Sequence, residues 1–454
     1  MLLQFTVGNY RSFREKTTFS LVAEPKERGH ESSLLDAQKA AGVKAVSLGV
    51  LYGANASGKS NLLQAIQTLK RLAVRGVEPD EPIPVDRFLL GGKNTIEIPP
   101  TFLEAHFVIG NEMYCYGLEC DVQRIRKEWL HVGQGETPLF DRRTESNGKV
   151  FVENYDELAR RSETSSERLG FIAEGTRANH PFFAQASRQN VGEIDAIRGW
   201  FLFGLNMQSE IRPPVERVSI SEDKIDQLGD FLRYADTGIT KVAMQIDPLE
   251  LESLSDSLRR NVEQWIQTSS RLTLRIPIMG RMTSLRYDSE SGEVYTSHLR
   301  AAHTNELGTE TFFDWSSESD GTRRMTELWQ MLFAVATGGR TIILDEMERS
   351  LHPELMRYLL QQWRKYAPPN TQLIFTTHND NLLEDDFLRR DEVWFVSKDK
   401  TGTSRMVSEV QFKPIEGVTR QRAYLDGMYG GVPKIAERYF HHNPPDLANN
   451  EGIK

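Results

Sequence analysis

The feature that most constrains this chain is a short glycine-rich loop between an apolar run and a helical pattern. Residues 53–60, with the sequence GANASGKS, match G-x-x-x-x-G-K-S at every fixed position. The apolar run Val46–Tyr52 before the loop predicts a buried strand. Behind the loop, apolar residues recur at helical spacing: Leu62, Leu63, Ile66, Leu69 and Leu72. This order of elements predicts an α/β fold with a phosphate-binding loop.

Each part of this loop has a chemical role. Its glycines let the backbone curl so that N–H groups point at a phosphate, and the following helix adds its positive N-terminal end. Lys59 supplies a charge to the β- and γ-phosphates, and the Ser60 hydroxyl ligates Mg²⁺. An accidental Gly-Lys-Ser turn is the alternative, but it would not require both the strand and the helix. We expect nucleotide contacts from Gly53, Asn55, Ala56, Ser57, Gly58, Lys59 and Ser60.

The chain lacks the motif that reads guanine, and this absence predicts which nucleotide base it binds. GTPases read guanine with the pattern N/T-K-x-D. The nearest match is residues 397–400, SKDK, and it ends in Lys400 where the acid is required. ATP is therefore favoured over GTP.

Two adjacent acids end a second apolar run. Residues 341–344, TIIL, predict a buried strand, and Asp345 and Glu346 follow it directly. An acid at the carboxyl end of a parallel strand lies beside the phosphate loop. Asp345 would then hold Mg²⁺ together with Ser60, and Glu346 would act as general base on the attacking water. A solvated strand end is the alternative, and the phosphate loop decides against it.

A serine-rich segment before a helical pattern forms the third candidate. Residues 319–322, Ser319, Asp320, Gly321 and Thr322, resemble the serine-glycine core of the ABC signature, with Asp320 where many families have glycine. A serine hydroxyl and N–H groups at a helix start form a second anion site. An ordinary helix N-cap would use the same residue types. The segment's place before the Asp345 strand favours the signature.

His378 ends another apolar run, residues 373–377. A histidine at the end of a core strand can hydrogen-bond the γ-phosphate and the attacking water. The alternative is a histidine that caps the helix beginning near Asn379 and Asp380. We expect His378 and Glu346 to be the catalytic pair.

Together these motifs resemble those of the ABC ATPases of the SMC, RecF and OLD (overcoming lysogenization defect) group. Four further runs carry the resemblance: N-Y-R-S-F (9–13), the loop extended to Asn61 (55–61), D-E-x-E-x-S-L-H-P (345–353) and T-T-H (376–378). Within this group the chain is similar to the small AAA-labelled ATPases of bacterial antiphage systems. The resemblance covers about residues 1–130 and 310–440, and residues 424–430 look like the family's C-terminal signature.

The resemblance implies a dimer that sandwiches ATP between Lys59 of one copy and Ser319 of another. It places Arg11 near the phosphates, Tyr10 near the base, and Asn61 among the nucleotide-binding residues. Residues 348–352 would cross the dimer interface. Gln123 is the candidate for the Q-loop glutamine.

The long separation of Lys59 from Asp345 requires a large insertion. From about Asn154 to Gln267 the chain is rich in charged and helix-forming residues, with strand-like patches only near 272–278 and 284–287. We predict an ABC-type P-loop ATPase head of class α/β, built from residues 1–150 and 301–454, with a mostly helical insertion at 151–300. Residues 441–454 are expected to be a frayed tail.

Composition excludes several classes of protein. The net charge of −9 argues against a surface coated with basic groups. No run approaches the roughly 20 apolar residues that span a bilayer, and the first residues lack the pattern of a signal peptide. Cys115 and Cys120 stand five apart on an expected strand, and no histidine pair lies nearby to complete a metal site. We expect two buried reduced thiols, a cytoplasmic location and no membrane partner.

These features predict an ATPase that regulates an antiphage system and works with a separate effector, a nuclease or toxin. The cofactors would be ATP and Mg²⁺, and the assembly a homodimer or higher homo-oligomer. A RecF-like repair ATPase is an alternative, for which nucleic acid would be the partner. An OLD-type nuclease is a second alternative. It would need a Toprim domain behind the head, for which the sequence after His378 leaves no room.

Overall fold

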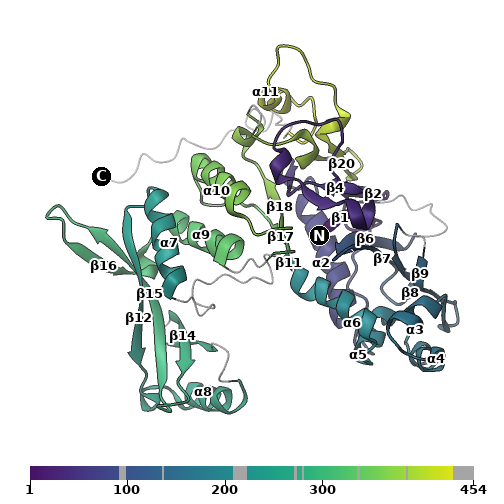
Figure 1. The fold of residues 1–454 in the computed structure, drawn as a ribbon, viewed down its shortest axis with the longest axis horizontal. Coiled ribbons are helices and arrows are strands. Elements are labelled where there is room, and N and C mark those ends of the chain that lie inside the picture. The colour runs from purple at the N-terminus through teal and green to yellow at the C-terminus, as the bar shows by residue number, and fades with distance from the viewer. Residues whose placement is uncertain are drawn as a thin grey trace, which may run out of the picture.

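The computed structural model describes residues 1–90, 99–134, 137–207, 222–269, 274–278, 281–334, 338–384 and 387–432. Figure 1 shows a layered head built from both ends of the chain, and an arm of strands that stands beside it. The head contains one antiparallel sheet and one mainly parallel sheet, with a helix between them. The chain leaves the head, forms the arm and returns, so the two separated sets of motifs meet in the head.

Seven antiparallel strands form the first sheet, in the order β10-β9-β8-β7-β6-β1-β2. Their bounds are β1 (Leu2–Gly8), β2 (Thr17–Ser20), β6 (Thr101–Ile109), β7 (Glu112–Cys120), β8 (Ile125–Val132), β9 (Thr137–Thr144) and β10 (Val150–Glu153). β1 and β2 pair as a hairpin, and Asn9 follows β1 directly. Along β6, Leu103 and Phe107 lie in the core, so every second residue faces away from it. A small hairpin, β3 (Leu35–Ala37) and β4 (Val43–Ala45) joined by α1 (Gln38–Ala41), lies nearby in the chain.

Six strands form the second sheet, in the order β11-β17-β18-β5-β19-β20. They are β5 (Leu48–Tyr52), β11 (Leu205–Met207), β17 (Thr341–Leu344), β18 (Gln372–Thr377), β19 (Val393–Lys398) and β20 (Ser404–Ser408). All neighbours run parallel except β19 and β20, which form an antiparallel hairpin. β5, β17 and β18 are buried along their whole length because both faces of the sheet are covered. Their carboxyl ends therefore meet at one edge.

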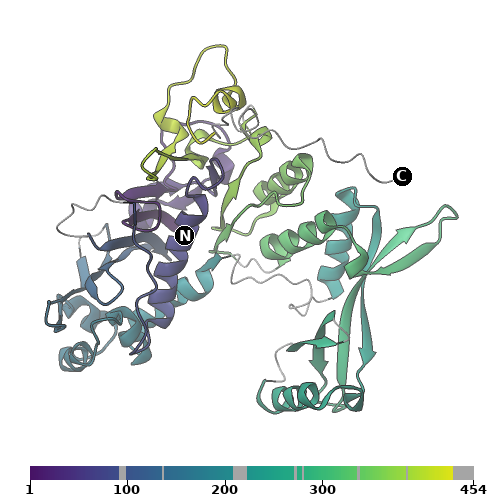
Figure 2. The ribbon, with the colours of Figure 1, turned by 180° about the vertical axis from the view of Figure 1, so that it is seen from behind.

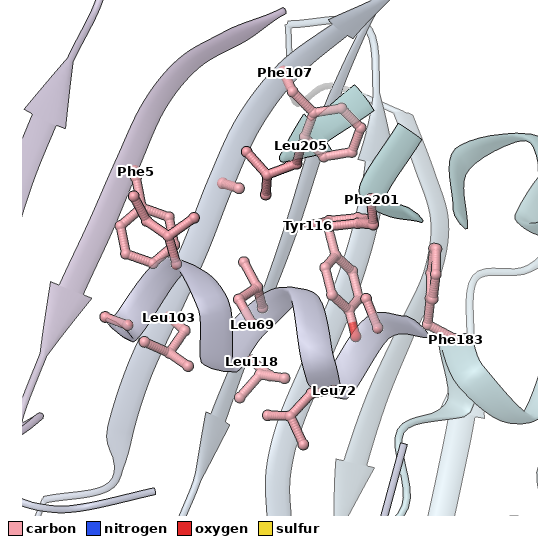
Figure 3. Close-up of a cluster of buried hydrophobic side chains, with 14 of the residues drawn as sticks. Phe5, Leu69, Leu72, Leu103, Phe107, Tyr116, Leu118, Phe183, Phe201 and Leu205 are labelled. Carbon is pink, nitrogen blue, oxygen red and sulfur yellow. The ribbon is translucent and has the colours of Figure 1, made fainter. Parts of the chain in front are cut away.

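Helix α2 (Lys59–Arg75) fills the space between the two sheets. Figure 3 shows Leu69 and Leu72 of this helix among Leu103, Leu118 and other side chains of the antiparallel sheet. The same core cluster includes Ile343, Ile374 and Val396 of the parallel sheet. α2 is buried on two sides, which holds the phosphate loop at its N-terminus in place.

Three helices cover the other face of the parallel sheet: α9 (Asp320–Trp329), α10 (Pro353–Tyr366) and α11 (Arg420–Leu425). Helix α7 (Glu222–Tyr234) packs against α9 on the side away from this sheet. α9 and α10 contribute Met325, Leu328, Leu359 and Trp363, all fully buried. α9 is the helix predicted behind residues 319–322.

The first part of the insertion is helical and belongs to the head. The helices are α3 (Asp156–Arg161), α4 (Ser166–Glu174), α5 (Phe182–Arg188) and α6 (Gly192–Gly199). Leu158, Phe183 and Ile194 from these helices join the same core cluster as the antiparallel sheet. The boundary expected at residue 150 therefore falls inside one continuous core.

The second part of the insertion is a sheet, and the prediction of a mostly helical segment is wrong here. β12 (Ile239–Pro248), β13 (Leu274–Ile278), β14 (Arg281–Tyr287), β15 (Val294–Thr304) and β16 (Glu310–Asp314) pair antiparallel, and α8 (Asp256–Ser269) lies at one end. Figure 2 shows this arm extending away from the head. Its small core includes Val262, Trp265 and Leu285. The apolar pattern does not predict β12 and β15, because their many polar residues interrupt the alternation of apolar and polar positions.

The remaining expectations concern loops, thiols and membranes. Residues 76–90 and 99–100 hold no helix or strand, and prolines at 79, 82, 84, 99 and 100 disfavour both. The tail expected at 441–454 lies outside the described residues. Cys115 and Cys120 are both free and buried on β7, which confirms the predicted reduced thiols. Across the described ranges, no helix combines the length and the hydropathy needed to cross a bilayer.

Candidate nucleotide and magnesium site

The phosphate loop connects β5 to α2 as predicted. Ala56 and Gly58 have positive φ angles of 60° and 120°, which curl the backbone over the helix start. Asn55 and Ala56 are exposed at the tip, whereas Ser57 and Lys59 are buried. The Lys59 ammonium folds back and donates to the carbonyl oxygens of Gly53, at 2.7 Å, and Ala54, at 3.2 Å. These interactions hold the cation in the loop, where a phosphate can exchange for the carbonyl oxygens.

Both fixed glycines are required by close packing. A Cβ atom on Gly53 would lie 2.3 Å from the carbonyl oxygen of Val396 in β19. A Cβ atom on Gly58 would lie 2.3 Å from the Ser404 hydroxyl in β20. The loop therefore rests directly on the β19–β20 hairpin, and any side chain at either glycine would displace it.

A network of hydroxyl groups fastens the loop to the turn after β1. Ser404 Oγ donates to the Ser57 carbonyl oxygen at 2.5 Å and also lies 2.7 Å from Ser12 Oγ. The Asn61 amide donates to Ser12 Oγ at 2.7 Å. Asn61, predicted to bind nucleotide, thus positions the loop through Ser12. The 9–13 motif belongs to the site because its turn carries Ser12.

Arg11, in the same turn, has a positive φ of 49°. Its guanidinium forms a salt bridge with Asp86 at 2.9 Å and donates to the amide oxygen of Gln64 on α2. Its proximity to the phosphates stays a prediction. Tyr10 is buried in the core, and its hydroxyl lies 3.0 Å from that of Thr68. Core contacts therefore occupy the Tyr10 ring.

Asp345 and Glu346 follow β17 at the edge where the phosphate loop lies. Thr376 of β18 holds both residues: its hydroxyl donates to Asp345 Oδ1 at 2.6 Å and accepts from the Glu346 N–H at 2.8 Å. Glu346 has a positive φ of 49°, and the residue is exposed. The strained backbone turns Glu346 away from the strand direction, while Asp345 stays fixed to β18.

His378, at the end of β18, lies directly against Lys59. The Lys59 ammonium donates to His378 Nε2 at 3.2 Å. Burial lowers the pKa of His378, and the positive charge of Lys59 lowers it further, against the raising effect of Glu348, Glu346 and Asp345. Burial also lowers the pKa of Lys59, and the same three acids oppose that shift. The site thus joins one buried lysine, one imidazole whose pKa is lowered and three acidic side chains.

Glu348 belongs to this group of charged residues, although the family resemblance implies a place for it at the dimer interface. Its Oε1 accepts a hydrogen bond from the His378 backbone N–H at 2.6 Å. Its Oε2 is buried and has no hydrogen-bond partner among the described residues. The resemblance placed 348–352 at a dimer interface. The structure brings Glu348 to the nucleotide edge, where it fixes the start of the loop after β18.

The signature candidate occupies the N-terminus of α9. Ser319 is the N-cap, and its Oγ accepts from the Thr322 N–H at 3.1 Å. Ser319 and Asp320 are exposed. A Cβ atom on Gly321 would lie 2.9 Å from the Ser350 carbonyl oxygen, so the cap touches the 348–352 segment. Within the described ranges, no hydrogen bond or ion pair joins residues 319–322 to the loop at 53–60.

The comparisons with known proteins agree with this geometry. A family model described as "AAA domain, putative AbiEii toxin, Type IV TA system" matches residues 48–384. The chain belongs to this family. The match includes the phosphate loop, the signature candidate, both acids and His378, and it confirms the predicted resemblance to AAA-labelled ATPases.

Solved structures give a more distant likeness. The SMC head domain from Thermotoga maritima is 12% identical, with a TM-score of 0.39, and the alignment covers 90% of this chain and 98% of that one. An SMC head bound to the C-winged helix domain of ScpA is 14% identical, with a TM-score of 0.39, and the alignment covers 90% and 97%. No curated protein matches the chain. Values this low carry no inference about function.

The structure also explains the 424–430 segment, for which the sequence offers no physical reason. The Tyr429 ring stacks on Phe395 of β19, with centroids 4.6 Å apart. Gly431 follows with a φ of 78°, and a Cβ atom there would lie 3.2 Å from the Cα of Gly53. The segment thus packs against the first residue of the phosphate loop.

A short strand at the edge of the parallel sheet was missed. β11 pairs with β17 and ends at Met207, opposite Ile343, but three residues are too few to show a periodic pattern. Gln208, which follows β11 in sequence, lies outside the described residues. Gln123, the Q-loop candidate, is exposed in the turn between β7 and β8 and donates its N–H to Asp121.

Proposed function

We propose that this chain binds ATP with Mg²⁺ and hydrolyses it in sites that two copies share. The observation that carries the proposal is the meeting of Lys59, the acids after β17 and His378 at one edge of the parallel sheet. A buried cation beside carboxylates at a helix N-terminus is suited to phosphoryl transfer, which depends on positioning and charge stabilisation.

The donor groups of this edge fit Mg²⁺. Mg²⁺ prefers hard oxygen ligands and keeps several waters, so one carboxylate and one hydroxyl suffice from the protein. Ser60 lies in the first turn of α2 next to Lys59, and Asp345 is fixed by Thr376. Ser60 and Asp345 would hold the ion, which when bound neutralises the charge that develops on the phosphate oxygens.

The chain's own side chains take distinct roles in hydrolysis. Lys59 binds the β- and γ-phosphates in place of its present carbonyl partners. Glu346, exposed at the edge, orients the attacking water and accepts its proton. His378, kept neutral by burial and by Lys59, donates an N–H to the γ-phosphate without adding a charge. Glu348 holds the His378 backbone in position.

The shared site rests on the separation of the two anion-binding helix ends. In one copy, Ser319 and Asp320 are exposed and the signature cap contacts the 348–352 segment instead of the phosphate loop. A second copy that supplies its own residues 319–322 would close the nucleotide against Lys59. Residues Ser319, Asp320, Gly321 and Thr322 would then act in trans, in a homodimer or a higher homo-oligomer.

We place this ATPase in an antiphage system, as the regulatory subunit of a separate effector. Two observations support the assignment: the description of the matching family refers to a putative toxin and a toxin–antitoxin system, and the motifs resemble antiphage ATPases. The arm offers a large surface outside the ATPase head for such a partner. The effector would be a nuclease or a toxin.

A pair of variants tests the ATPase assignment. Lys59→Ala should abolish ATP binding because the loop loses its buried cation. Glu346→Gln should bind ATP, hydrolyse it on the order of 10²-fold more slowly, and form a dimer with ATP that is longer-lived than the wild-type dimer. Binding is measured by calorimetry, turnover by phosphate release and assembly by light scattering. Unchanged ATP affinity in Lys59→Ala would refute the nucleotide site, and a Glu346→Gln variant that stays monomeric with ATP would refute sharing.

A further inference from the structure

Three metal-ligating side chains converge on the outer face of the antiparallel sheet. Cys115 of β7 lies directly opposite His106 of β6 in the strand register, and Glu104 stands two residues along β6 on the same face. Leu103, Ala105 and Phe107, which alternate with them, point into the core. This cluster therefore faces away from α2 and belongs to no part of the nucleotide site.

The donor atoms of this cluster have the spacing of ligands on one tetrahedral ion. His106 Nε2 lies 3.1 Å from Glu104 Oε1 and 3.6 Å from Cys115 Sγ, and all three atoms lie within 4.8 Å of one another. With zinc bonds of about 2.0 Å to nitrogen or oxygen and about 2.3 Å to sulfur, tetrahedral donors stand roughly 3.3–3.6 Å apart. The two closest pairs thus need little movement to coordinate a common ion.

Neighbouring residues hold the cluster in this arrangement. The Trp129 indole N–H donates to Glu104 Oε2 at 2.9 Å, which leaves Oε1 directed at His106. The indole lies over Gly117, where a Cβ atom would come within 2.4 Å of the ring. A hydrogen bond that orients a ligating carboxylate is typical of metal sites.

We propose that Glu104, His106 and Cys115 form a binding site for Zn²⁺ or a similar thiophilic divalent cation. One thiolate, one imidazole and one carboxylate form a mixed donor set that suits zinc and is unsuited to Mg²⁺ or Ca²⁺, which take oxygen ligands. A second histidine is not required, because three protein ligands with one open position are common for zinc. The His106 and Glu104 side chains are 24% and 20% exposed, so an ion can reach them from solvent.

Binding requires the Cys115 thiol to lose its proton to solvent as the sulfur–metal bond forms. Burial raises the pKa of the Cys115 thiol, and the charge of Glu104 adds to the shift, so the thiol stays neutral without a cation. Without metal, the cluster would be a hydrogen-bonded set of a neutral thiol, an imidazole and a carboxylate. That metal-free state is the competing account of the geometry.

Cobalt titration distinguishes the two accounts. Untagged full-length protein is stripped with a chelator and titrated with Co²⁺ without nucleotide, and the thiolate-to-cobalt charge-transfer band is recorded. We expect one equivalent per chain, and Zn²⁺ should displace Co²⁺ and bleach the band. Cys115→Ser should abolish the band. The Glu104→Gln and His106→Gln variants retain the Cys115 thiol, and each should weaken Co²⁺ binding by a factor on the order of 10 or more.

Cys120→Ala is the matched control. Cys120 lies on the same strand but is fully buried in the core cluster on the opposite face. This variant should keep the cobalt band and its stoichiometry. The proposal fails if the wild-type protein shows no thiolate band, or if Cys115→Ser retains it. Circular dichroism shows whether Cys115→Ser folds. If it misfolds, Glu104→Gln becomes the test, and unchanged Co²⁺ affinity in that variant refutes the site.

Discussion

At the scale of single residues, charged and titratable side chains gather at the edge of the parallel sheet where the phosphate loop lies. Their positions decide how strongly each one shifts the pKa of its neighbours. Lys59 is buried and loses solvation, yet three acids nearby compensate for this loss. His378 receives opposing influences from the same groups. The two glutamates differ in environment, since Glu346 is exposed and Glu348 accepts a backbone hydrogen bond with one oxygen while the other is buried. This difference predicts different responses to mutation.

Glu348→Gln should reduce ATP turnover by less than about 10-fold, because glutamine can still accept the hydrogen bond from the His378 N–H. Glu348→Ala removes that acceptor and should reduce turnover further. Glu346→Gln should cost on the order of 10²-fold or more, because it removes the general base. Steady-state phosphate release at saturating ATP makes the comparison. If Glu348→Gln were slower than Glu346→Gln, Glu348 would be the general base in place of Glu346.

The pKa of His378 should lie below its ordinary value of 6.5, because burial and Lys59 disfavour the charged ring. The unfolded chain then binds more protons than the folded chain just below pH 6.5, so stability falls as pH falls through this range. Imidazole NMR, assigned with His378→Gln, should give a midpoint below 6.5. Lys59→Met should raise that midpoint, because it removes the positive charge and leaves the three acids in place. A wild-type midpoint above 6.5 would contradict this account.

At the scale of elements, the N-terminal ends of two helices carry the anion-binding groups. α2 follows the phosphate loop, and α9 starts at Ser319. A substitution at either helix end can be tested for its effect on ATP hydrolysis in a dimer with a differently substituted copy. An N-cap serine also contributes about 1 kcal/mol to helix stability, so a substitution at Ser319 needs a control for the lost cap.

Ser319→Arg should leave ATP binding to the monomer nearly intact, and it should prevent ATP-driven dimerisation and hydrolysis by steric clash. An equal mixture of Ser319→Arg and Lys59→Ala should recover part of the activity, because mixed dimers carry both defects in one site and leave the other whole. Thr419→Arg, at the N-cap of α11, loses a similar cap elsewhere and should behave like the wild type. If Ser319→Arg alone hydrolyses ATP normally, the signature assignment is wrong and residues 319–322 form an ordinary helix N-cap.

At the scale of the whole molecule, the chain divides into a head with two large core clusters and an arm with its own small core. α7 connects the two, because it packs on β12 of the arm while its residues join the core under α9 and α10. A change in the head at α9 can therefore reach the arm through packed side chains. This connection is a route by which the nucleotide state could act on an effector bound to the arm.

The proposed defence role predicts a stable partner encoded next to this gene. Co-expression with the neighbouring gene should yield a complex whose size changes between ATP-bound Glu346→Gln and nucleotide-free Lys59→Ala. Size-exclusion chromatography with light scattering measures both states. A neighbour with nuclease or toxin activity would support the assignment. A neighbour that binds neither state would refute the two-component arrangement and leave the ATPase assignment untouched.

The residues of the nucleotide site were predictable from sequence because each motif is local. The phosphate loop, the acids after β17 and His378 all directly follow buried strands, and strand ends in a parallel sheet meet at one edge. The arm was harder to predict. Its strands have one solvated face, and their polar residues weaken the apolar pattern that distinguishes strand from helix.

The sequence by itself thus determined which residues form the proposed nucleotide site, since the glycines, the lysine and the acids lie within short segments and would act through backbone curvature and charge. Only the tertiary structure decided which distant residues touch them. Ser12, Asn61 and Ser404 meet across most of the chain, and Glu348 reaches His378 because β17 and β18 pair in one register. The cluster of Glu104, His106 and Cys115 likewise depends on the β6–β7 register, where a shift of one residue would place its members on opposite faces.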